Sequence, residues 1–362
     1  MKKVLSALLS IALGCSFALG LVACGGDDKG SSNPKDMTGD KVTAEQWSAA
    51  LSAESLSGGQ VKAVQTESGK FTLPDSTTKV NGTNIETITY TIAGDKQYSK
   101  YEVSVSGDKA YVDAYNAFMA GRDNTQENYS SKVDDDIYIH YRKNSDGVWT
   151  FDVRNHGLFN GLEMMVHYGT MYDNFEYNSD KKGYTIKEDD PMAKDLAGTV
   201  LKFKKDKLSA VYSERTKQSD GETITMSVSY SITYGTYTVN LPAATSSLAG
   251  TWKTEEISYQ GNALEAIPGS FLDSEQDVPV TADSVTITAN NDGTATFKFL
   301  TATGKGAYEF YDDDDDLYGY FYSNDLPGAE EGDNDLYLTY DKDSKILSFR
   351  MMGLTVKLKK SA

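Results

Sequence analysis

The clearest pattern in the chain is a strict alternation of apolar and polar residues. From Thr223 to Gly235 every second residue is apolar, and Thr, Ser or Gly fills each gap. A period of two places successive side chains on opposite faces of a strand, so this run predicts an antiparallel strand with one covered and one solvated face. At about 3.3 Å per residue the strand would span on the order of 36 Å.

The same alternation predicts further strands earlier in the chain. Their apolar positions are Ile88, Tyr90 and Ile92; Tyr101, Val103 and Val105; Ile137, Ile139 and Tyr141; and Trp149, Phe151 and Val153. Together with the long run, they predict an antiparallel sheet that is apolar on one face only.

Two segments have helical spacing and are predicted to cover that face. Thr43 and Gln46 fit a capping box, and Trp47 opens an apolar stripe, which predicts a helix from Ala44 to Ser55. The segment from Gly157 to Asp173 carries its apolar residues on one side. A curved antiparallel sheet with helices in its concavity resembles the LolA/LprG-type lipoprotein fold, an unclosed barrel that carries lipid. The resemblance covers about residues 42–242, including the closing segment from Tyr234 to Pro242.

This resemblance implies a ligand held between the sheet and the helix from Gly157 to Asp173. The residues expected to line it are Leu158, Leu162, Met165, Val166, Met226, Val228 and Tyr230. If the helix near Trp47 completes the cover, the core is solid; otherwise a gap of roughly 300–1,000 Å³ remains for a lipid tail.

A second β domain is predicted after the small-residue linker at residues 243–247. Gly250-Thr251-Trp252 opens a series of about eight short alternating strands up to residue 362, and Asn290 to Gly293 forms a turn between two of them. Gly-x-Trp followed by such strands resembles a lipocalin-like barrel, in which the Trp closes one end. The resemblance implies that Arg350 stacks on Trp252. The family's Thr-Asp-Tyr motif is absent. Eight strands close a small barrel around its own side chains or one small ligand.

The N-terminus is typical of an exported protein. Lys2 and Lys3 precede an apolar run from Val4 to Val22, which is the layout of a signal peptide. Leu21-Val22-Ala23-Cys24 resembles a bacterial lipobox, which implies cleavage before Cys24 and a diacylglycerol on its thiol. We therefore expect a signal peptide over residues 1–23, a flexible tether over 24–41, and attachment to the extracytoplasmic face of a bacterial membrane.

Composition excludes several classes of function. Without the signal, the chain has 33 basic and 53 acidic residues, a net charge of −20, which argues against nucleic-acid binding. Both cysteines, Cys15 and Cys24, lie at the front of the chain, so the body has no thiol chemistry. No Gly-x-Ser-x-Gly, His-Glu-x-x-His or nucleotide-binding glycine motif is present, and we expect no enzyme activity and no cofactor beyond the lipid.

The remaining candidate residues have alternative interpretations. His140, His156 and His167 are expected to be solvated rather than metal ligands. The run from Asp312 to Asp316 fails the EF-hand pattern and predicts a hairpin tip, with Asp312, Asp314 and Asp316 as weak calcium candidates. Tyr308, Tyr311, Tyr318, Tyr320 and Tyr322 crowd the flanking strands and suit either a contact surface or an ordinary exposed sheet.

The leading hypothesis is a membrane-anchored lipoprotein that binds a hydrophobic or amphiphilic ligand. The alternatives are a surface interaction module with solid cores and, third, a glycan hydrolase. The sequence names no protein partner.

Overall fold

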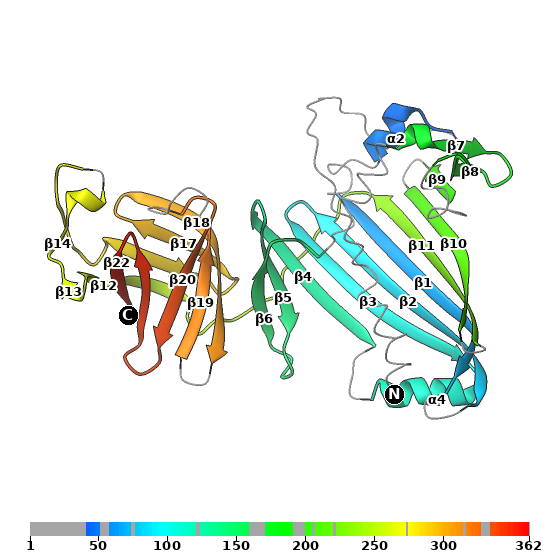
Figure 1. Cartoon of the computed structure of the whole chain (residues 1–362), viewed down its shortest axis with the longest axis horizontal. Coiled ribbons are helices and arrows are strands. Elements are labelled where there is room, and N and C mark those ends of the chain that lie inside the picture. Colours follow the sequence, from blue (N-terminus) through cyan, green and yellow to red (C-terminus); the bar gives the residue numbers. More distant parts are fainter. Residues whose placement is uncertain are drawn as a thin grey trace. The chain divides into compact units, whose positions relative to one another are not determined.

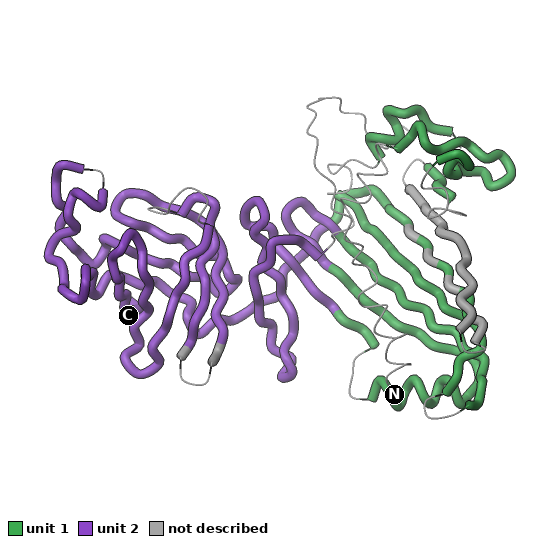
Figure 2. The backbone as a smooth tube through the Cα atoms, viewed as in Figure 1, with its two compact units in different colours: residues 1–91, 99–126, 161–237 green, residues 92–98, 127–160, 238–362 purple. Residues whose placement is uncertain are grey.

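The computed structural model describes residues 41–50, 58–73, 77–120, 124–158, 171–190, 200–204, 207–219, 222–272, 274–313, 316–326 and 334–361. The chain divides into two compact units (Figure 2). Unit 1 comprises residues 1–91, 99–126 and 161–237, and unit 2 comprises residues 92–98, 127–160 and 238–362. Residues 127–160 therefore group with the C-terminal part of the chain, whereas the sequence led us to expect a division at residues 243–247.

The described strands form two large antiparallel sheets (Figure 1). The larger has the order β6-β5-β4-β3-β2-β1-β11-β10-β9-β8-β7. Its strands are β1 (Gly59–Thr72), β2 (Lys79–Ala93), β3 (Lys96–Gly107), β4 (Thr125–Asp134), β5 (Ile137–Lys143), β6 (Trp149–Arg154), β7 (Phe175–Asn178), β8 (Gly183–Ile186), β9 (Val200–Lys204), β10 (Lys207–Ser219) and β11 (Glu222–Tyr234). Each strand that alternation predicted is present.

In unit 1, helix α2 (Ala44–Ala50) begins at the predicted capping box. The Thr43 N–H donates to Gln46 Oε1 over 3.0 Å, and the Gln46 N–H donates to Thr43 Oγ1 over 3.2 Å. Trp47 is buried among aromatic rings of β7–β9 and the adjoining 3₁₀ turn η2 (Tyr172–Asn174); the rings are Tyr172, Phe175, Tyr184 and Phe203. This helix therefore packs on the short strands of unit 1. Residues 51–57, where the predicted helix continues, lie outside the described residues.

A helix that the sequence analysis did not predict, α4 (Lys109–Phe118), also belongs to unit 1 (Figure 1). It follows β3 directly, and its start is tied to β2, because the Asn81 N–H donates to Asp108 Oδ2 over 2.7 Å. Gly82 allows the ring of Tyr111 on α4 to pack directly on β2, because a Cβ at position 82 would lie 2.6 Å from that ring. The predicted helix from Gly157 to Asp173 falls mostly on residues 159–170, outside the described residues.

Unit 2 contains a closed antiparallel barrel of eight strands. Its strands are β12 (Gly250–Tyr259), β16 (Val285–Ala289), β17 (Thr294–Phe299), β18 (Ala302–Asp313), β19 (Asp316–Tyr322), β20 (Asp335–Asp341), β21 (Ile346–Met351) and β22 (Leu354–Lys360). Pairing of β12 with β22 closes the circle. Three short strands lie outside this circle: β13 (Asn262–Ala263), which pairs with β12, and β14 (Ala266–Ile267) and β15 (Val278–Pro279), which pair with each other. The 3₁₀ turn η3 (Gly269–Phe271) lies between β14 and β15.

The barrel interior is filled by side chains. Phe297 lies at the centre, with its ring 5.8 Å from those of both Phe321 and Phe349. Trp252 is buried at one end, where its Nε1–H donates to the Leu248 carbonyl over 2.9 Å. The cation above its ring is Lys360, at 5.8 Å, while Arg350 is exposed between the inward Phe349 and Met351. The expectation that Arg350 stacks on Trp252 is wrong, because alternation places it on the outer face.

The other part of unit 2, β4–β6, packs against the outside of the barrel. Ile137, Ile139 and Tyr141 form a buried cluster with Ala244 and Ala307. The Tyr141 hydroxyl donates to the Asp292 carbonyl over 2.7 Å. Gly293, with φ of 84°, leaves room for the neighbouring ring, since a Cβ there would lie 2.9 Å from Phe151. These contacts explain why the compact units do not follow the predicted linker.

Candidate functional site

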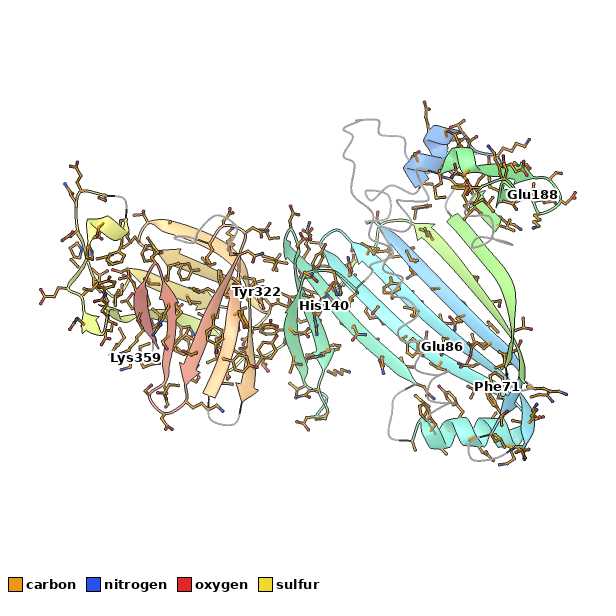
Figure 3. All side chains as sticks on the ribbon, in the orientation of Figure 1. Phe71, Glu86, His140, Glu188, Tyr322 and Lys359 are labelled. Carbon is orange, nitrogen blue, oxygen red and sulfur yellow. The ribbon has the colours of Figure 1, made fainter. Side chains whose placement is uncertain are left out.

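A buried polar cluster lies on the face of unit 1 that alternation assigns to the core. In β2 the positions in phase with Ile88, Tyr90 and Ile92 include Asn84 and Glu86. Asn84 is 3% exposed and Glu86 is 8% exposed. Figure 3 marks Glu86 on the middle of the sheet. A carboxyl and an amide therefore occupy two positions where an ordinary core would have apolar side chains.

Two neighbouring elements complete this cluster. The Asn84 Nδ2–H donates to Glu86 Oε1 over 3.1 Å, and the Tyr101 hydroxyl on β3 donates to the same carboxyl group. Helix α4 supplies Tyr111, whose ring centroid lies 4.8 Å from that of Phe71, and the buried Tyr115. We call Asn84, Glu86, Tyr101, Tyr111 and Tyr115 the Glu86 cluster.

Burial sets the protonation of these groups. It raises the pKa of Glu86, against the opposing effect of hydrogen bonds from Asn84 and Tyr101. Burial likewise raises the pKa of Tyr101 and of Tyr115, and it raises that of Tyr111 to about 12, with the negative charges of Glu67 and Glu86 adding to the effect on Tyr111. The phenols therefore keep their protons at neutral pH and act as hydrogen-bond donors, whereas the Glu86 carboxyl group takes up its proton at a higher pH than an exposed glutamate does.

One acceptor in the cluster is left over. Within the part of the chain that the structure describes, Asn84 Oδ1 is buried and accepts no hydrogen bond. Buried polar atoms are nearly always paired, because an unpaired one costs about 1–3 kcal/mol. The cluster thus offers an amide oxygen and a carboxyl group to a hydrogen-bond donor.

The register connects this cluster with the predicted ligand-lining residues of β11. Tyr230, Val228 and Met226 pair with Ala63, Gln65 and Glu67 of β1. Gln65 and Glu67 pair in turn with Glu86 and Asn84 of β2. Directly paired residues share a face of the sheet, so these β11 positions and the Glu86 cluster lie on the same face.

The other predicted lining residues are not brought to this face by the described structure. Leu158 is half-buried and belongs to unit 2, apart from the cluster's unit. Leu162, Met165 and Val166 lie outside the described residues, as does Cys24.

Asn84, Glu86 and α4 were not predicted from the sequence. The signal for the first two was present, since they continue the apolar phase of Ile88 and Ile92 toward Val80 with polar residues. Helix α4 is short and is stabilised by tertiary contact with β2. Its own sequence therefore carries no local pattern as clear as the alternation in β2.

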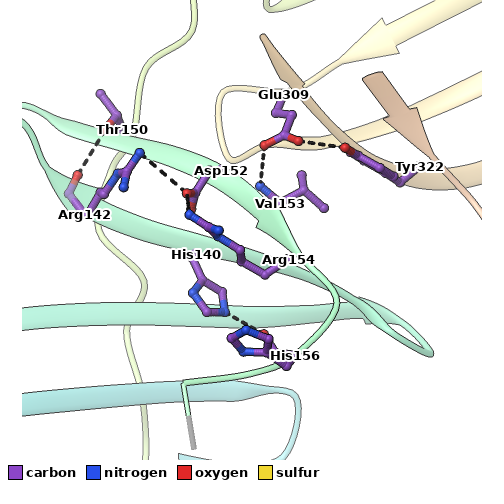
Figure 4. A network of polar contacts seen from close by, with 9 residues as sticks. All are labelled: His140, Arg142, Thr150, Asp152, Val153, Arg154, His156, Glu309 and Tyr322. Atoms are coloured by element: carbon purple, nitrogen blue, oxygen red, sulfur yellow. Dashed lines mark hydrogen bonds and ion pairs between the residues drawn. The ribbon is translucent and has the colours of Figure 1, made fainter. Parts of the chain in front are cut away.

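A second polar cluster in unit 2 joins the edge strand β6 to the barrel (Figure 4). Glu309 is 3% exposed; its Oε2 accepts the Val153 N–H at 2.8 Å, and its Oε1 accepts the Tyr322 hydroxyl at 2.7 Å. On β6, Asp152 binds Arg154 at 2.5 Å and Arg142 at 3.5 Å. The partners of Glu309 hold β6 against β18 and β19, so its role is structural.

The tyrosines of β18–β20 form a ladder on the outer face of the barrel. Tyr311 stacks on Tyr318 with ring centroids 5.4 Å apart, and Tyr320 stacks on Tyr322 at 5.8 Å. Tyr337 contacts both Tyr318 and Tyr320. Tyr311 is 42% and Tyr337 is 50% exposed. We call these five residues the tyrosine ladder. Tyr308, by contrast, is buried and bonds to the Asn290 carbonyl.

The structure does not test the predicted calcium candidates. In the described residues no group of three or more His, Cys, Asp or Glu side chains could hold a metal ion. The side chains of Asp312, Asp314 and Asp316 lie outside the described part of the structure. His140 is half-buried and His156 is exposed; His140 Nε2 lies 2.7 Å from the His156 carbonyl oxygen, and burial lowers the pKa of His140. His167 falls outside the described residues.

Comparison with known proteins adds little. No family model matches the chain, and no curated protein matches it. One solved structure with some similarity is that of a protein from Nitrosomonas europaea described as AttH. It is 10% identical, the alignment covers 82% of this chain and 92% of that one, and the TM-score is 0.11. Similarity at this level carries no argument about fold or function.

Proposed function

We propose that the chain is a lipid-anchored, extracytoplasmic bacterial protein whose unit 1 binds an amphiphilic ligand. The signal peptide and lipobox ending at Cys24 support the anchor. No helix among the described residues is long and apolar enough to cross a membrane. The role is binding without catalysis, and the only prosthetic group is the diacylglycerol on Cys24.

The observation that carries the proposal is the Glu86 cluster on the face of the sheet that alternation assigns to the core. A sheet that needed only a solid core would place apolar residues at Asn84 and Glu86, because burying a polar group costs free energy. A face that receives an amphiphile needs apolar positions for the tail and a few polar groups for the head. Met226, Val228 and Tyr230 supply the first kind, and Asn84 and Glu86 the second.

The test uses the full chain carrying Cys24→Ser, so that no acyl group of its own competes. It is titrated by calorimetry with ten-carbon amphiphiles below their micellar concentrations. Ala63 lies between Ile88 and Tyr230 on the proposed binding face, and Val64 is on the opposite face of the same strand. We expect Ala63→Trp to weaken binding about tenfold or more and Val64→Trp to leave it unchanged. Absence of binding to every probe would refute the proposal.

A second candidate function has its own observation. The barrel of unit 2 is filled by its core, and two residues of the tyrosine ladder on its outer face, Tyr311 and Tyr337, are exposed. Tyrosine is enriched where proteins contact partners. We therefore propose, as the alternative, a surface interaction module acting through this ladder.

Photo-crosslinking on intact cells tests the alternative. A photoreactive residue replaces Tyr337 in one variant and Tyr259, which is 38% exposed and outside the ladder, in the other. We expect a discrete crosslinked species from the Tyr337 position alone. Equal patterns from both positions would exclude the ladder as a specific contact surface.

A further inference from the structure

We propose that the ligand's head group is a primary ammonium, held by Glu86 and Asn84 among the rings of Tyr101, Tyr111 and Tyr115. This inference rests on the proposed binding of an amphiphile by unit 1 and names the chemistry of its head. It uses groups that come from two strands and one helix of the same unit.

The groups around Glu86 include a hydrogen-bond acceptor without a donor, so a ligand that donates hydrogen bonds would fit them. Asn84 Oδ1 accepts no hydrogen bond from the described residues, and its amide nitrogen is already used on Glu86 Oε1. An ammonium carries three donors and no acceptor. It can reach Asn84 Oδ1 and the carboxylate together, whereas a ligand carboxylate would bring more acceptors to a site that already has a surplus.

The charges point to a cation. Within the described residues, the groups bonded to the Glu86 carboxyl are the neutral side chains of Asn84 and Tyr101, and the nearest charged residue in the β1–β2 register is a second carboxylate, Glu67, opposite Asn84. A buried carboxylate without a counter-charge is costly, and a bound cation offsets that cost. A ligand with a negative head would instead meet the like charge of Glu86.

The aromatic groups suit the same ligand. Tyr101 donates its hydroxyl to Glu86, and Tyr111 and Tyr115 project from α4 close enough for their pKa values to respond to the Glu86 charge. Tyrosine rings attract ammonium groups, by about 0.5–1 kcal/mol at exposed sites and about 2 or more when desolvated. Three tyrosines whose pKa values respond to one carboxylate therefore give this region the polarity that favours a cation.

The groups facing Glu86 set how binding depends on pH. They are Glu67 on β1, Tyr101 on β3, and Tyr111 and Tyr115 on α4. The tyrosines stay neutral across the working range, so the carboxyl groups decide the charge of the site. Ammonium binding should therefore weaken as the pH falls and Glu86 takes up its proton.

The test compares heads on one tail. The full chain carrying Cys24→Ser is titrated with decylamine, decyltrimethylammonium, decanol and decanoate. We expect decylamine to bind about tenfold or more tightly than the others, because it alone combines a positive charge with N–H donors. Glu86→Gln should remove the preference of the site for decylamine over the other three probes. The matched control is Glu102→Gln, a carboxyl of β3 that pairs with Lys100 at 2.7 Å.

The outcomes separate the two proposals. If the probes bind equally well, or if Glu86→Gln leaves the preference for decylamine intact, the ammonium inference is overturned while amphiphile binding stands. If no probe binds, the proposed function fails and this inference falls with it. Circular dichroism of each variant checks that the fold is unchanged. The variant Asn84→Leu keeps the Glu86 carboxylate but removes the free acceptor, Asn84 Oδ1. It should therefore weaken the binding of decylamine more than that of decyltrimethylammonium.

Discussion

At the scale of single residues, Glu86 is the clearest departure from ordinary core chemistry. Its carboxyl group is nearly inaccessible, and burial raises its pKa above the usual 4.5. The folded protein therefore holds this proton more tightly than the unfolded chain does, so the free energy of unfolding falls as the pH rises from the unfolded pKa through the folded one.

We predict that Glu86→Gln stabilises the ligand-free protein at neutral pH, because it removes a desolvated charge. The gain should vanish below the ordinary glutamate pKa of 4.5, where both proteins are neutral at this position. Urea unfolding at the two pH values measures it. Glu102→Gln, at an ion-paired position, is the control. A wild type more stable than Glu86→Gln at neutral pH would contradict the account.

Trp252 is the second residue whose substitution should have a large effect on the free energy of unfolding. It is buried at the end of the barrel and its indole N–H has a partner in Leu248. Trp252→Ala should cost about 3–5 kcal/mol in the free energy of unfolding, because it opens a large cavity and strands a carbonyl. Trp252→Phe, which keeps most of the volume, should cost less. Similar losses from both variants, measured in urea, would show that the side-chain volume is not the cause.

At the scale of elements, helix α2 depends on its capping box. Thr43 and Gln46 satisfy each other's backbone N–H groups, and the helix then places Trp47 among the rings of β7–β9. Thr43→Ala should lower the free energy of unfolding by about 1 kcal/mol, whereas Thr43→Ser should retain most of it. If the two substitutions were equivalent in urea unfolding, the hydroxyl would have no capping role.

The edge strand β6 depends on Glu309 in a comparable way. An edge strand leaves N–H groups unpaired, and Glu309 accepts that of Val153. Glu309→Ala should speed hydrogen exchange at the Val153 amide, while Glu309→Gln keeps an acceptor and should change it less. Mass spectrometry of peptides from β6 and, for comparison, β21 measures the effect. Equal exchange in β6 of the wild type and Glu309→Ala would rule out this contact as the source of protection.

At the scale of the whole molecule, the proposed anchor decides where the protein acts. Cys24 is the proposed lipidation site, and the sequence offers it as the residue after the lipobox. Cys24→Ser should shift the protein from the detergent phase to the aqueous phase or leave the signal uncleaved, because the acyl chains supply the membrane affinity. Phase partitioning with Triton X-114, followed by mass determination, measures both. A processed Cys24→Ser protein in the detergent phase would exclude the lipid anchor.

The sequence by itself was sufficient for five strands of the larger sheet and for the barrel. Alternation identified β2, β3, β5, β6 and β11, and the inward residues of the barrel strands, such as Ile287, Phe297 and Val356, are buried as predicted. It also identified the capping box at Thr43. These features are local: a period of two or a spacing of three residues carries the physical preference within a few positions.

Other features were decided only by the tertiary structure. Residues 127–160 join the C-terminal unit because Tyr141, Phe151 and Val153 find partners near Asp292, Tyr308 and Glu309, more than a hundred residues away. Helix α4 forms where Gly82 lets Tyr111 approach, and Asn84 and Glu86 become a cluster only when β3 and α4 lie beside β2. Such contacts depend on which distant residues meet, and no local periodicity encodes that meeting.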